Sequence, residues 1–321
     1  MSQQATPSVN KATSNGVKIL ILIDANSLIH RCFHALPPLT GPNNQPAGAL
    51  YGLSSVLIKI LREQKPDYIA AFFDRPEPTF RKEIFNDYKI HRPKAPDELV
   101  SQIIEARNLI EAFGIKFFEA PGFEADDLIG SAAEKFSAKG GSAIGGKNEP
   151  DLKIIILTGD LDSLQLVEKD KVVVETFKKG ISETIIYNEE AVKERYGGLL
   201  PAQIADYKGL VGDPSDNIPG VMGIGPKTAA PLIKNYGNLE NFLEKGGAEK
   251  DYEKIVKSKD IALLSKKLAV IKRDVSLNID NLSELKYNGL LKEVVENYFE
   301  KLGFKSLIKR INNHSMGFTA T

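Results

Sequence analysis

The sequence has one cysteine, Cys32, among 321 residues, so no disulfide can form within the chain. A reducing, cytoplasmic location is the simplest expectation for such a protein. Long apolar runs are also missing: residues 19–23 and 154–157 are far shorter than the roughly 20 residues that a membrane-spanning helix needs. Residues 1–16 are polar and have neither the apolar stretch of a secretory signal nor the arginines of a transit peptide. We therefore expect a soluble protein with a disordered tail over 1–16 and no membrane partner.

Histidine is scarce, and the paired cysteines of a structural zinc site are absent, which argues against zinc. We interpret the four histidines as ordinary surface or core side chains: His30, His34, His91 and His314.

The net charge of the chain is zero, since 42 Lys and Arg balance 42 Asp and Glu. At face value this balance argues against a nucleic-acid partner, because such domains usually carry a basic excess.

Three apolar, β-branched or aromatic runs lead into an aspartate. KILILID ends at Asp24, YIAAFFD at Asp74 and KIIILTGD at Asp160. Such runs are typical of buried parallel strands, and helical patterns separate them. The remaining pattern predicts a helix over 50–63, a helix from about 97 to 113, a short strand over 115–121 and a helix opened by EADDLIG. This alternation predicts a three-layer α/β domain with a mostly parallel sheet.

Later parts of the chain follow other patterns. Residues 138–150 are rich in glycine and predict a flexible loop before the strand that leads to Asp160. After about residue 187 the strand pattern fades and helices are expected. Near the end, apolar residues form a helical stripe that we interpret as a packing face: Leu291, Val294, Val295, Tyr298, Phe299 and Leu302.

Nine carboxylates stand out by position. In an open α/β sheet, ligands bind beyond the carboxyl ends of the strands. Taken singly, aspartates at strand ends and in turns are more often helix caps or turn formers. Gathered together they would repel one another, and hard divalent cations relieve that repulsion. Two such ions about 4 Å apart are typical of phosphodiester hydrolysis. The nine are Asp24, Asp74, Glu124, Asp126, Asp127, Asp160, Asp162, Asp213 and Asp216.

A metal centre would also change the charge argument. With nine acids assigned to metals, the remaining chain has 42 Lys and Arg against 33 acids, so zero net charge no longer excludes DNA.

The segment PGVMGIGPKTAA over 219–230 contains closely spaced glycines. It is not a phosphate-binding P-loop, because Pro226 stands where that motif requires lysine. No apolar strand precedes it, which excludes a dinucleotide fingerprint. A tight turn that feeds a helix at Lys227 would fit, with free N–H groups to hold a backbone phosphate. A plain helix–turn–helix corner is the alternative.

Two segments are basic. Residues 80–96 have five Lys and Arg against two acids, interleaved with aromatic residues, which is typical of single-strand binding or of a mobile surface loop. Residues 254–273 have seven Lys and Arg against Asp260. A solvated helix face is the default interpretation of this second segment, and duplex phosphate binding is the alternative.

These segments, in order, closely resemble the 5′-nuclease domain at the amino end of bacterial DNA polymerase I, in a family that includes phage 5′-exonucleases and, more distantly, flap endonucleases. The resemblance covers nearly everything from Val17 to about Ile311. It is most specific in PGFEADDLIG, LTGDLDSLQLV and ADYKGLVGDPSDNIPGVMGIGPKTA. The family implies a PIN-like nuclease core with a helical arch, followed by a helical region that contains a helix–three-turn–helix.

The resemblance also implies roles for single residues. The first metal site is expected to comprise Asp24, Asp74, Glu124 and Asp126, and the second to comprise Asp160, Asp162 and Asp213, with Asp127 and Asp216 nearby or acting through water. Lys89 and Arg92 match arch residues that reach the scissile phosphate. Further substrate contacts are expected from Arg31, Arg81 and Tyr88, and duplex contacts from Gly223, Gly225, Lys227 and Thr228, with a monovalent cation such as K⁺ at that turn.

The sequence therefore predicts a tail over 1–16, a catalytic domain over 17–186 and a helical DNA-binding region over 187–321, with the helix–three-turn–helix at about 201–237. The expected activity is 5′-3′ exonuclease and 5′-flap endonuclease cleavage of DNA with Mg²⁺ or Mn²⁺, in primer removal and repair. We expect a monomer without polymerase activity, working beside a polymerase on a separate chain. A non-catalytic DNA-structure-binding protein and an RNA-cutting enzyme of related fold are the alternatives, and a nucleotide-binding phosphotransferase is the weakest.

Overall fold

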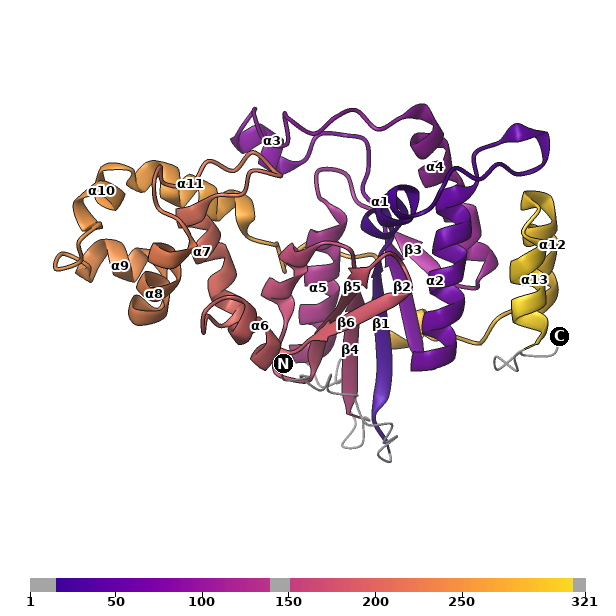
Figure 1. The fold of residues 1–321 in the computed structure, drawn as a ribbon. Helices are drawn as coiled ribbons and strands as arrows, with labels where there is room; N and C mark the ends of the chain where they lie inside the picture. Colours follow the sequence, from indigo (N-terminus) through magenta and orange to yellow (C-terminus); the bar gives the residue numbers. More distant parts are fainter. Residues whose placement is uncertain (1–15, 139–150, 314–321) are drawn as a thin grey trace, which may run out of the picture.

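A six-stranded sheet lies at the centre of the computed structural model, which describes residues 16–138 and 151–313 (Figure 1). The strand order is β3-β2-β1-β4-β5-β6, with the first five strands parallel and β6 antiparallel to β5. Their bounds are β1 Lys18–Asp24, β2 Tyr68–Phe72, β3 Lys116–Phe118, β4 Leu152–Leu157, β5 Val172–Lys179 and β6 Glu183–Tyr187. The predicted tail, apart from Gly16, and the predicted loop after residue 138 lie outside the described residues.

Both faces of the sheet are covered, which explains why its strands are apolar throughout. Along β1, Ile21 and Ile23 pack on one face with α1 (Ala25–Ala35), α2 (Gly48–Gln64) and α4 (Asp97–Ala112). The alternate residues Leu20 and Leu22 pack on the other face with α5 (Ala125–Ala138). Successive side chains of a strand point to opposite faces, so every β1 position between helices must be apolar. The predicted three-layer, mostly parallel α/β fold is confirmed.

The predicted helices over 50–63 and 97–113 and the predicted strand over 115–121 correspond to α2, α4 and β3. The sequence pattern assigned no element to α1 or to the hairpin of β5 and β6. The short 3₁₀ helices are η1 Pro42–Asn44, η2 Leu161–Leu166, η3 Pro201–Gln203 and η4 Leu282–Leu285.

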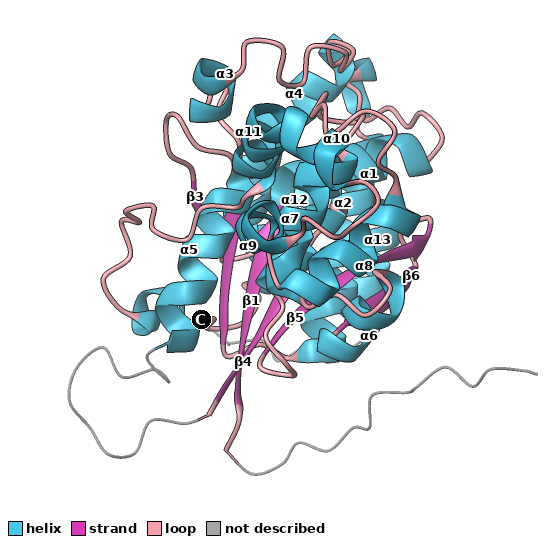
Figure 2. Ribbon diagram, turned by 90° about the vertical axis from the view of Figure 1, so that its left-hand side faces the viewer, coloured by secondary structure: helices cyan, strands magenta, loops and turns pink. Residues whose placement is uncertain are grey.

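A second body of short helices follows the sheet and lies beside it, in front of the sheet in the turned view (Figure 2). Its own apolar core includes Leu210, Ile233 and Phe242. Within it, α7 and α11 approach closely at Gly209, where an added Cβ would lie 3.0 Å from the carbonyl oxygen of Ala262. The helices are α6 Glu189–Arg195, α7 Ile204–Val211, α8 Pro226–Tyr236, α9 Leu239–Lys245, α10 Tyr252–Lys257 and α11 Lys259–Ala269.

The connection from β2 to α4, residues 73–96, carries the five-residue helix α3 (Phe80–Ile84) and runs along the top of the molecule toward α11 (Figure 1). It is anchored there, because Tyr88 is buried in a small apolar cluster with Ile218 and Leu268. This connection therefore joins the sheet domain to the helical body.

The end of the chain returns to the sheet domain. Ile279 and Leu285 belong to the apolar core on the α5 side, while α12 (Lys292–Leu302) and α13 (Lys305–Asn312) pack on the opposite face. The predicted apolar stripe is only partly buried: Val295 and Phe299 are enclosed, but Leu291 and Val294 are exposed. The buried half of this stripe packs against α4, so α12 and α13 lie on the sheet domain and not within the helical body. Within the described residues, no helix has the length and apolarity needed to cross a membrane.

Candidate functional site

The carboxyl ends of the parallel strands open into one cavity of about 450 Å³. Strand register explains why aspartates meet there: Asp24 at the end of β1 pairs with Phe72, two residues before Asp74, and β4 ends beside β1 just before Asp160. The first turn of α5 adds further carboxylates from above the same edge. The acids that line the cavity are Asp24, Asp74, Glu124, Asp126 and Asp160.

Three of these acids also cap helices. Asp24 accepts a hydrogen bond from the N–H of Ser27 at 3.0 Å at the start of α1. Asp74 accepts from the N–H of Ala125 at 2.7 Å, and Asp160 accepts from the N–H of Asp162 at 2.9 Å. The capping role considered for single aspartates is therefore real, and it coexists with their position on the cavity wall.

Burial raises the pKa of several of these carboxyl groups, because it removes water from the charged form. The pKa of Asp24 rises to about 7 through burial and the nearby charge of Asp74. Burial and the surrounding aspartates raise the pKa of Asp126 well above its ordinary value, and burial raises that of Asp74. The cavity therefore favours either a proton or a cation on these groups.

A second set of acids lies toward the helical body and is paired with lysine. The ammonium of Lys208 contacts both Asp162 and Asp213, the latter at 2.6 Å. Burial raises the pKa of Asp162 to about 6, although Lys208 opposes the shift. Burial would also raise the pKa of Asp213, but its bonds to Lys208 and Ser215 outweigh burial and lower it. Lys208, in α7, was not predicted from the sequence, where its only signal is its place five residues before Asp213.

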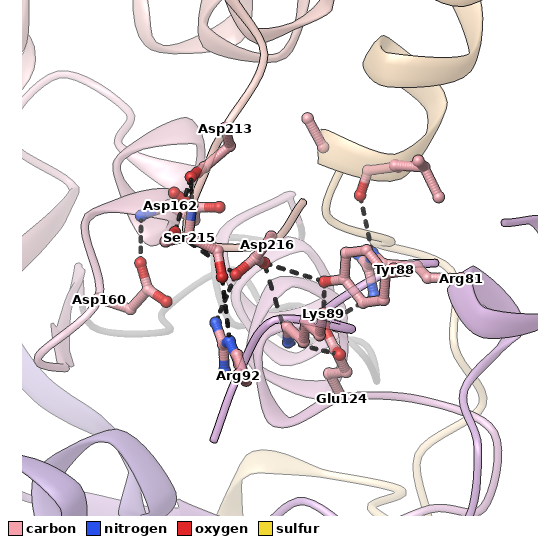
Figure 3. A network of polar contacts seen from close by, with 12 residues as sticks. Arg81, Tyr88, Lys89, Arg92, Glu124, Asp160, Asp162, Asp213, Ser215 and Asp216 are labelled. Carbon is pink, nitrogen blue, oxygen red and sulfur yellow. Dashed lines mark hydrogen bonds and ion pairs between the residues drawn. The ribbon is translucent and has the colours of Figure 1, made fainter. Parts of the chain in front are cut away.

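The two sets meet at a smaller cavity of about 20 Å³, lined by Asp126, Asp160, Asp162 and Asp216 among others. Figure 3 shows how basic residues of the β2–α4 connection reach these acids. Lys89 lies 2.6 Å from Glu124, and Arg92 donates to Asp216. In the described parts of the chain, no three His, Cys, Asp or Glu side chains are grouped so that they could hold one metal ion as placed.

The donor set nevertheless fits hard divalent cations in its chemistry. All the acids on the cavity wall offer carboxylate oxygens, the ligands that Mg²⁺ and Mn²⁺ prefer. Two histidines, His30 and His34, stand four residues apart on α1 and line the same cavity. From the sequence both were expected to be ordinary surface or core side chains, whereas in the structure they lie at the site.

Asp127 differs from its expected place near a metal. Its side chain is fully buried, and its two oxygens accept hydrogen bonds from the Arg81 guanidinium at 2.7 and 2.8 Å. It also accepts from the N–H of Lys272 at 2.8 Å. Because these donors occupy both oxygens, the structure gives Asp127 a place beside the site as the partner of Arg81, and its expected role near a metal or through water stays a prediction.

Arg81 and Tyr88 also differ from their expected role as substrate contacts. Arg81 is 3% exposed and, besides Asp127, donates to the carbonyl oxygens of Leu268 and Val270. Tyr88 is 4% exposed, and its hydroxyl lies 3.1 Å from both Glu124 and Asp216. These two side chains are turned inward, because their partners lie in α5, α11 and the loop after α7. They hold the β2–α4 connection in place and are not available at the surface.

The other expected basic residues do face the cavity: Lys89, Arg92 and Arg31 belong to its lining. Arg31 also donates to the carbonyl oxygen of Gly180 at 3.1 Å, which ties α1 to the turn between β5 and β6.

The glycine-rich segment forms a tight turn into α8. Gly220 has a positive φ of 62°, and an added Cβ would lie 2.3 Å from the N atom of Gly212, so only glycine fits. Gly225 caps α8, Pro226 takes the first helical position, and Lys227 is exposed beside them. The partly exposed Thr228 sits in the first turn, and Gly223 also has a positive φ. Such a helix start exposes N–H groups to an anion.

Two family models match the chain. Residues 19–197 match the 5′-3′ exonuclease N-terminal resolvase-like domain, and residues 199–293 match the 5′-3′ exonuclease C-terminal SAM fold. Among curated relatives, a 5′-3′ exonuclease from Aquifex aeolicus is 36% identical over 306 residues, which cover 91% of this chain and 100% of the relative. DNA polymerase I from Caldicellulosiruptor bescii is 42% identical over 297 residues, 91% of this chain and 33% of the polymerase. The chain thus spans about a third of the length of the polymerases that it resembles.

Solved structures share the fold at lower identity. T5 5′-exonuclease with bound zinc aligns with a TM-score of 0.63 at 20% identity, covering 78% of this chain and 89% of the phage protein. The catalytic core of Rad2 in complex with DNA substrate aligns with a TM-score of 0.57 at 17% identity, covering 91% of this chain and 92% of the core.

Proposed function

The chain belongs to the 5′-3′ exonuclease family, and from this membership we propose that it hydrolyses DNA phosphodiester bonds at or near 5′ ends, including 5′ flaps, with Mg²⁺ or Mn²⁺. One observation carries the proposal: five carboxylates from three parallel strands and α5 line the same cavity as Lys89 and Arg92. Acids that bind divalent cations and bases that attract a phosphate are the two requirements of such a reaction.

Each group of residues has its own task in this proposal. Asp24, Asp74, Glu124 and Asp126 hold one cation, and Asp160, Asp162 and Asp213 hold another, with Asp216 beside them. Divalent cations, when bound, lower the pKa of the attacking water and neutralise the leaving oxygen. The chain's own part is to fix these carboxylates at the strand ends, so that little reorganisation is needed when the substrate arrives.

Lys89 and Arg92 bring positive charge to the scissile phosphate. Both side chains now contact acids of the site, Glu124 and Asp216, at hydrogen-bond distance. In this proposal they exchange these contacts for contacts to the scissile phosphate when the substrate binds. Arg31, on the α1 side of the cavity, adds a third cation within reach of the same DNA strand.

Duplex DNA next to the cleaved strand would bind at the start of α8. We propose that the N–H groups near Gly223, Gly225, Lys227 and Thr228 hold a backbone phosphate, with a K⁺ ion at the turn. Lys254 of α10 supports this proposal, since its ammonium lies beside Gly223 of this turn. We further propose a task in primer removal and repair, as a monomer in the cytoplasm beside a DNA polymerase. The polymerase relatives support the link to a polymerase.

The test is cleavage of a labelled 5′-flap duplex with Mg²⁺, with Mn²⁺ and with a chelator. We expect short 5′ products with either metal and none with the chelator. Nicked and single-stranded DNA, together with a matched RNA flap, show the balance of exonuclease and flap cleavage and exclude an RNA-specific enzyme. Flap binding without metal-dependent cleavage would instead support a non-catalytic DNA-binding protein.

A further inference from the structure

The six residues Thr158–Ser163 connect the two groups of acids. They follow β4 directly and have the sequence TGDLDS. Asp160 and Asp162 belong to the proposed second metal site. The residues at the two ends of the segment, Thr158 and Ser163, are hydroxyl residues that are fully buried.

Thr158 joins one acid from each group. Its hydroxyl donates to Oδ2 of Asp24 at 2.7 Å, and its oxygen accepts the backbone N–H of Asp160 at 2.9 Å. The Ser27 hydroxyl lies 3.1 Å from the same oxygen and accepts the N–H of Gly159. A hydroxyl has one proton and two lone pairs, and an ionised carboxylate only accepts. The direction is therefore fixed for ionised Asp24: Ser27 donates to Thr158, and Thr158 donates to Asp24.

Ser163 makes the corresponding contact at the other end of the segment. Its hydroxyl donates to Oδ1 of Asp126 at 3.0 Å. Asp126 lies in the first turn of α5, which sits on the sheet face opposite α1. The same short segment thus holds an acid at the end of β1 and an acid of α5, while it supplies two acids of its own.

We propose that Thr158 and Ser163 are positioning residues that set the orientation of Asp24 and Asp126 and couple the geometry of the two proposed metal sites. The inference rests on the function proposed above. A carboxylate without such a donor is free to rotate about its side-chain bonds, and groups that orient metal ligands change metal affinity by about 10- to 100-fold. Because the Thr158 oxygen also holds the N–H of Asp160, its loss should disturb both sites, whereas the loss of the Ser163 hydroxyl should disturb one.

The experiment measures Mn²⁺ binding to the DNA-free full chain by electron paramagnetic resonance and calorimetry. Thr158→Val and Ser163→Ala remove the hydroxyls with little change in volume. We expect Thr158→Val to lower the affinity of both sites for Mn²⁺, and Ser163→Ala to lower the affinity of one site, by about 10- to 100-fold. Thr158→Ser, which keeps the hydroxyl, should restore most of the affinity.

The matched control is Ser54→Ala. Ser54 is also fully buried, but its hydroxyl donates to the carbonyl oxygen of Leu50 within α2, on the side of the sheet away from α5. It should lower the melting temperature slightly and leave Mn²⁺ affinity unchanged, which separates positioning from general stability. If the parent binds Mn²⁺ and cleaves DNA while Thr158→Val and Ser163→Ala bind Mn²⁺ as tightly, this inference is overturned and the proposed function stands. A parent that binds no Mn²⁺ overturns both.

Discussion

Seven acids of the site fall into two classes that differ in what holds them. Asp24, Asp74 and Asp126, here named the uncharged-partner acids, accept hydrogen bonds from backbone N–H groups and hydroxyls. Glu124, Asp162, Asp213 and Asp216, the cation-paired acids, contact lysine or arginine. The first class has raised pKa values because neutral donors do not offset burial. In the second class Lys208 lowers the pKa of Asp213, whereas burial outweighs the same lysine at Asp162 and raises its pKa.

The difference indicates two ways to keep carboxylates in a protein interior. The uncharged-partner acids stay oriented at some cost in electrostatic repulsion, which an external cation would relieve. The cation-paired acids are neutralised by the chain itself, so an incoming cation or phosphate must exchange with Lys89, Arg92 or Lys208. Removing an acid of the first class should therefore cost activity without costing stability, whereas breaking a buried ion pair should cost stability.

The largest expected effect is on activity, from Asp126→Asn. It removes one charge from the most crowded acids of the cavity and keeps the size of the side chain. We expect metal-dependent flap cleavage to fall at least about a thousandfold, which corresponds to about 4 kcal/mol of activation free energy. Urea unfolding in chelator should show equal or higher stability than the parent, since the repulsion is reduced. Near-parent cleavage rates would contradict the assignment of Asp126 to the site.

Asp127, the residue after Asp126, is also paired with a cation, and Asp127→Asn tests what that pairing contributes to stability. This change breaks the buried pair with Arg81 and leaves the guanidinium with Glu124, 3.3 Å away, as its remaining charged partner. Breaking such a pair costs about 3 kcal/mol of unfolding free energy. Urea unfolding of Asp127→Asn and of Asp126→Asn, both in chelator at neutral pH, measures this loss of unfolding free energy. Equal stabilities of the two variants would mean that the classes of acid do not differ as argued.

Asp126 and Asp127 also show how much of the site can be predicted from the sequence. The strand-end aspartates and the α/β alternation follow from local patterns of apolar residues, so the sheet and most of the cavity wall were predicted. Local pattern cannot tell which of two adjacent aspartates faces the cavity. That depends on Arg81, which is 46 residues away, and on Lys272, which is 145 residues away.

The same dependence on residues far away in the sequence explains why the roles of Arg81, Lys208 and Thr158 were not predicted. Arg81 belongs to a basic, aromatic segment, but its inward orientation depends on carbonyl oxygens at the end of α11. Lys208 has no motif of its own, and its role appears only when α7 brings it between Asp162 and Asp213. Thr158 looks like any strand-end threonine until Asp24 is placed beside it.

A smaller effect is expected from Lys208→Met, which removes the cation from between Asp162 and Asp213. In chelator the unpaired carboxylates should lower stability by about 2 kcal/mol. Saturating Mn²⁺ should narrow the difference from the parent measured in the same buffer, because the bound ion would replace the missing cation between the two carboxylates. The readout is the free energy of unfolding with and without Mn²⁺.

Lys266→Met is the matched control for that variant. Lys266 also bridges two acids, Asp206 and Glu240, each at 2.6 Å, but within the helical body and outside the cavity lining. It should lose stability relative to the parent by the same amount with and without Mn²⁺, since the ion stabilises the parent and this variant alike. Recovery of both lysine variants, or of neither, would count against a special position of Lys208 at the metal site.

The smallest effect separates the two classes by pH, in chelator. The folded pKa of Asp24 is about 7, above its ordinary value of 3.8, so the folded chain binds more protons than the unfolded chain between these values. Stability from this group is therefore present at low pH and is lost as pH rises toward 7. Asp213 has a lowered pKa and acts in the opposite sense: its contribution is present above pH 3.8 and is lost as pH falls through the lower folded value. Unfolding free energies measured between pH 4 and 8 should fall with rising pH in the parent and fall less in Asp24→Asn, while Asp213→Asn should leave that slope unchanged. An Asp24→Asn variant whose stability falls as steeply as that of the parent would show that Asp24 does not titrate with a raised pKa in the folded chain.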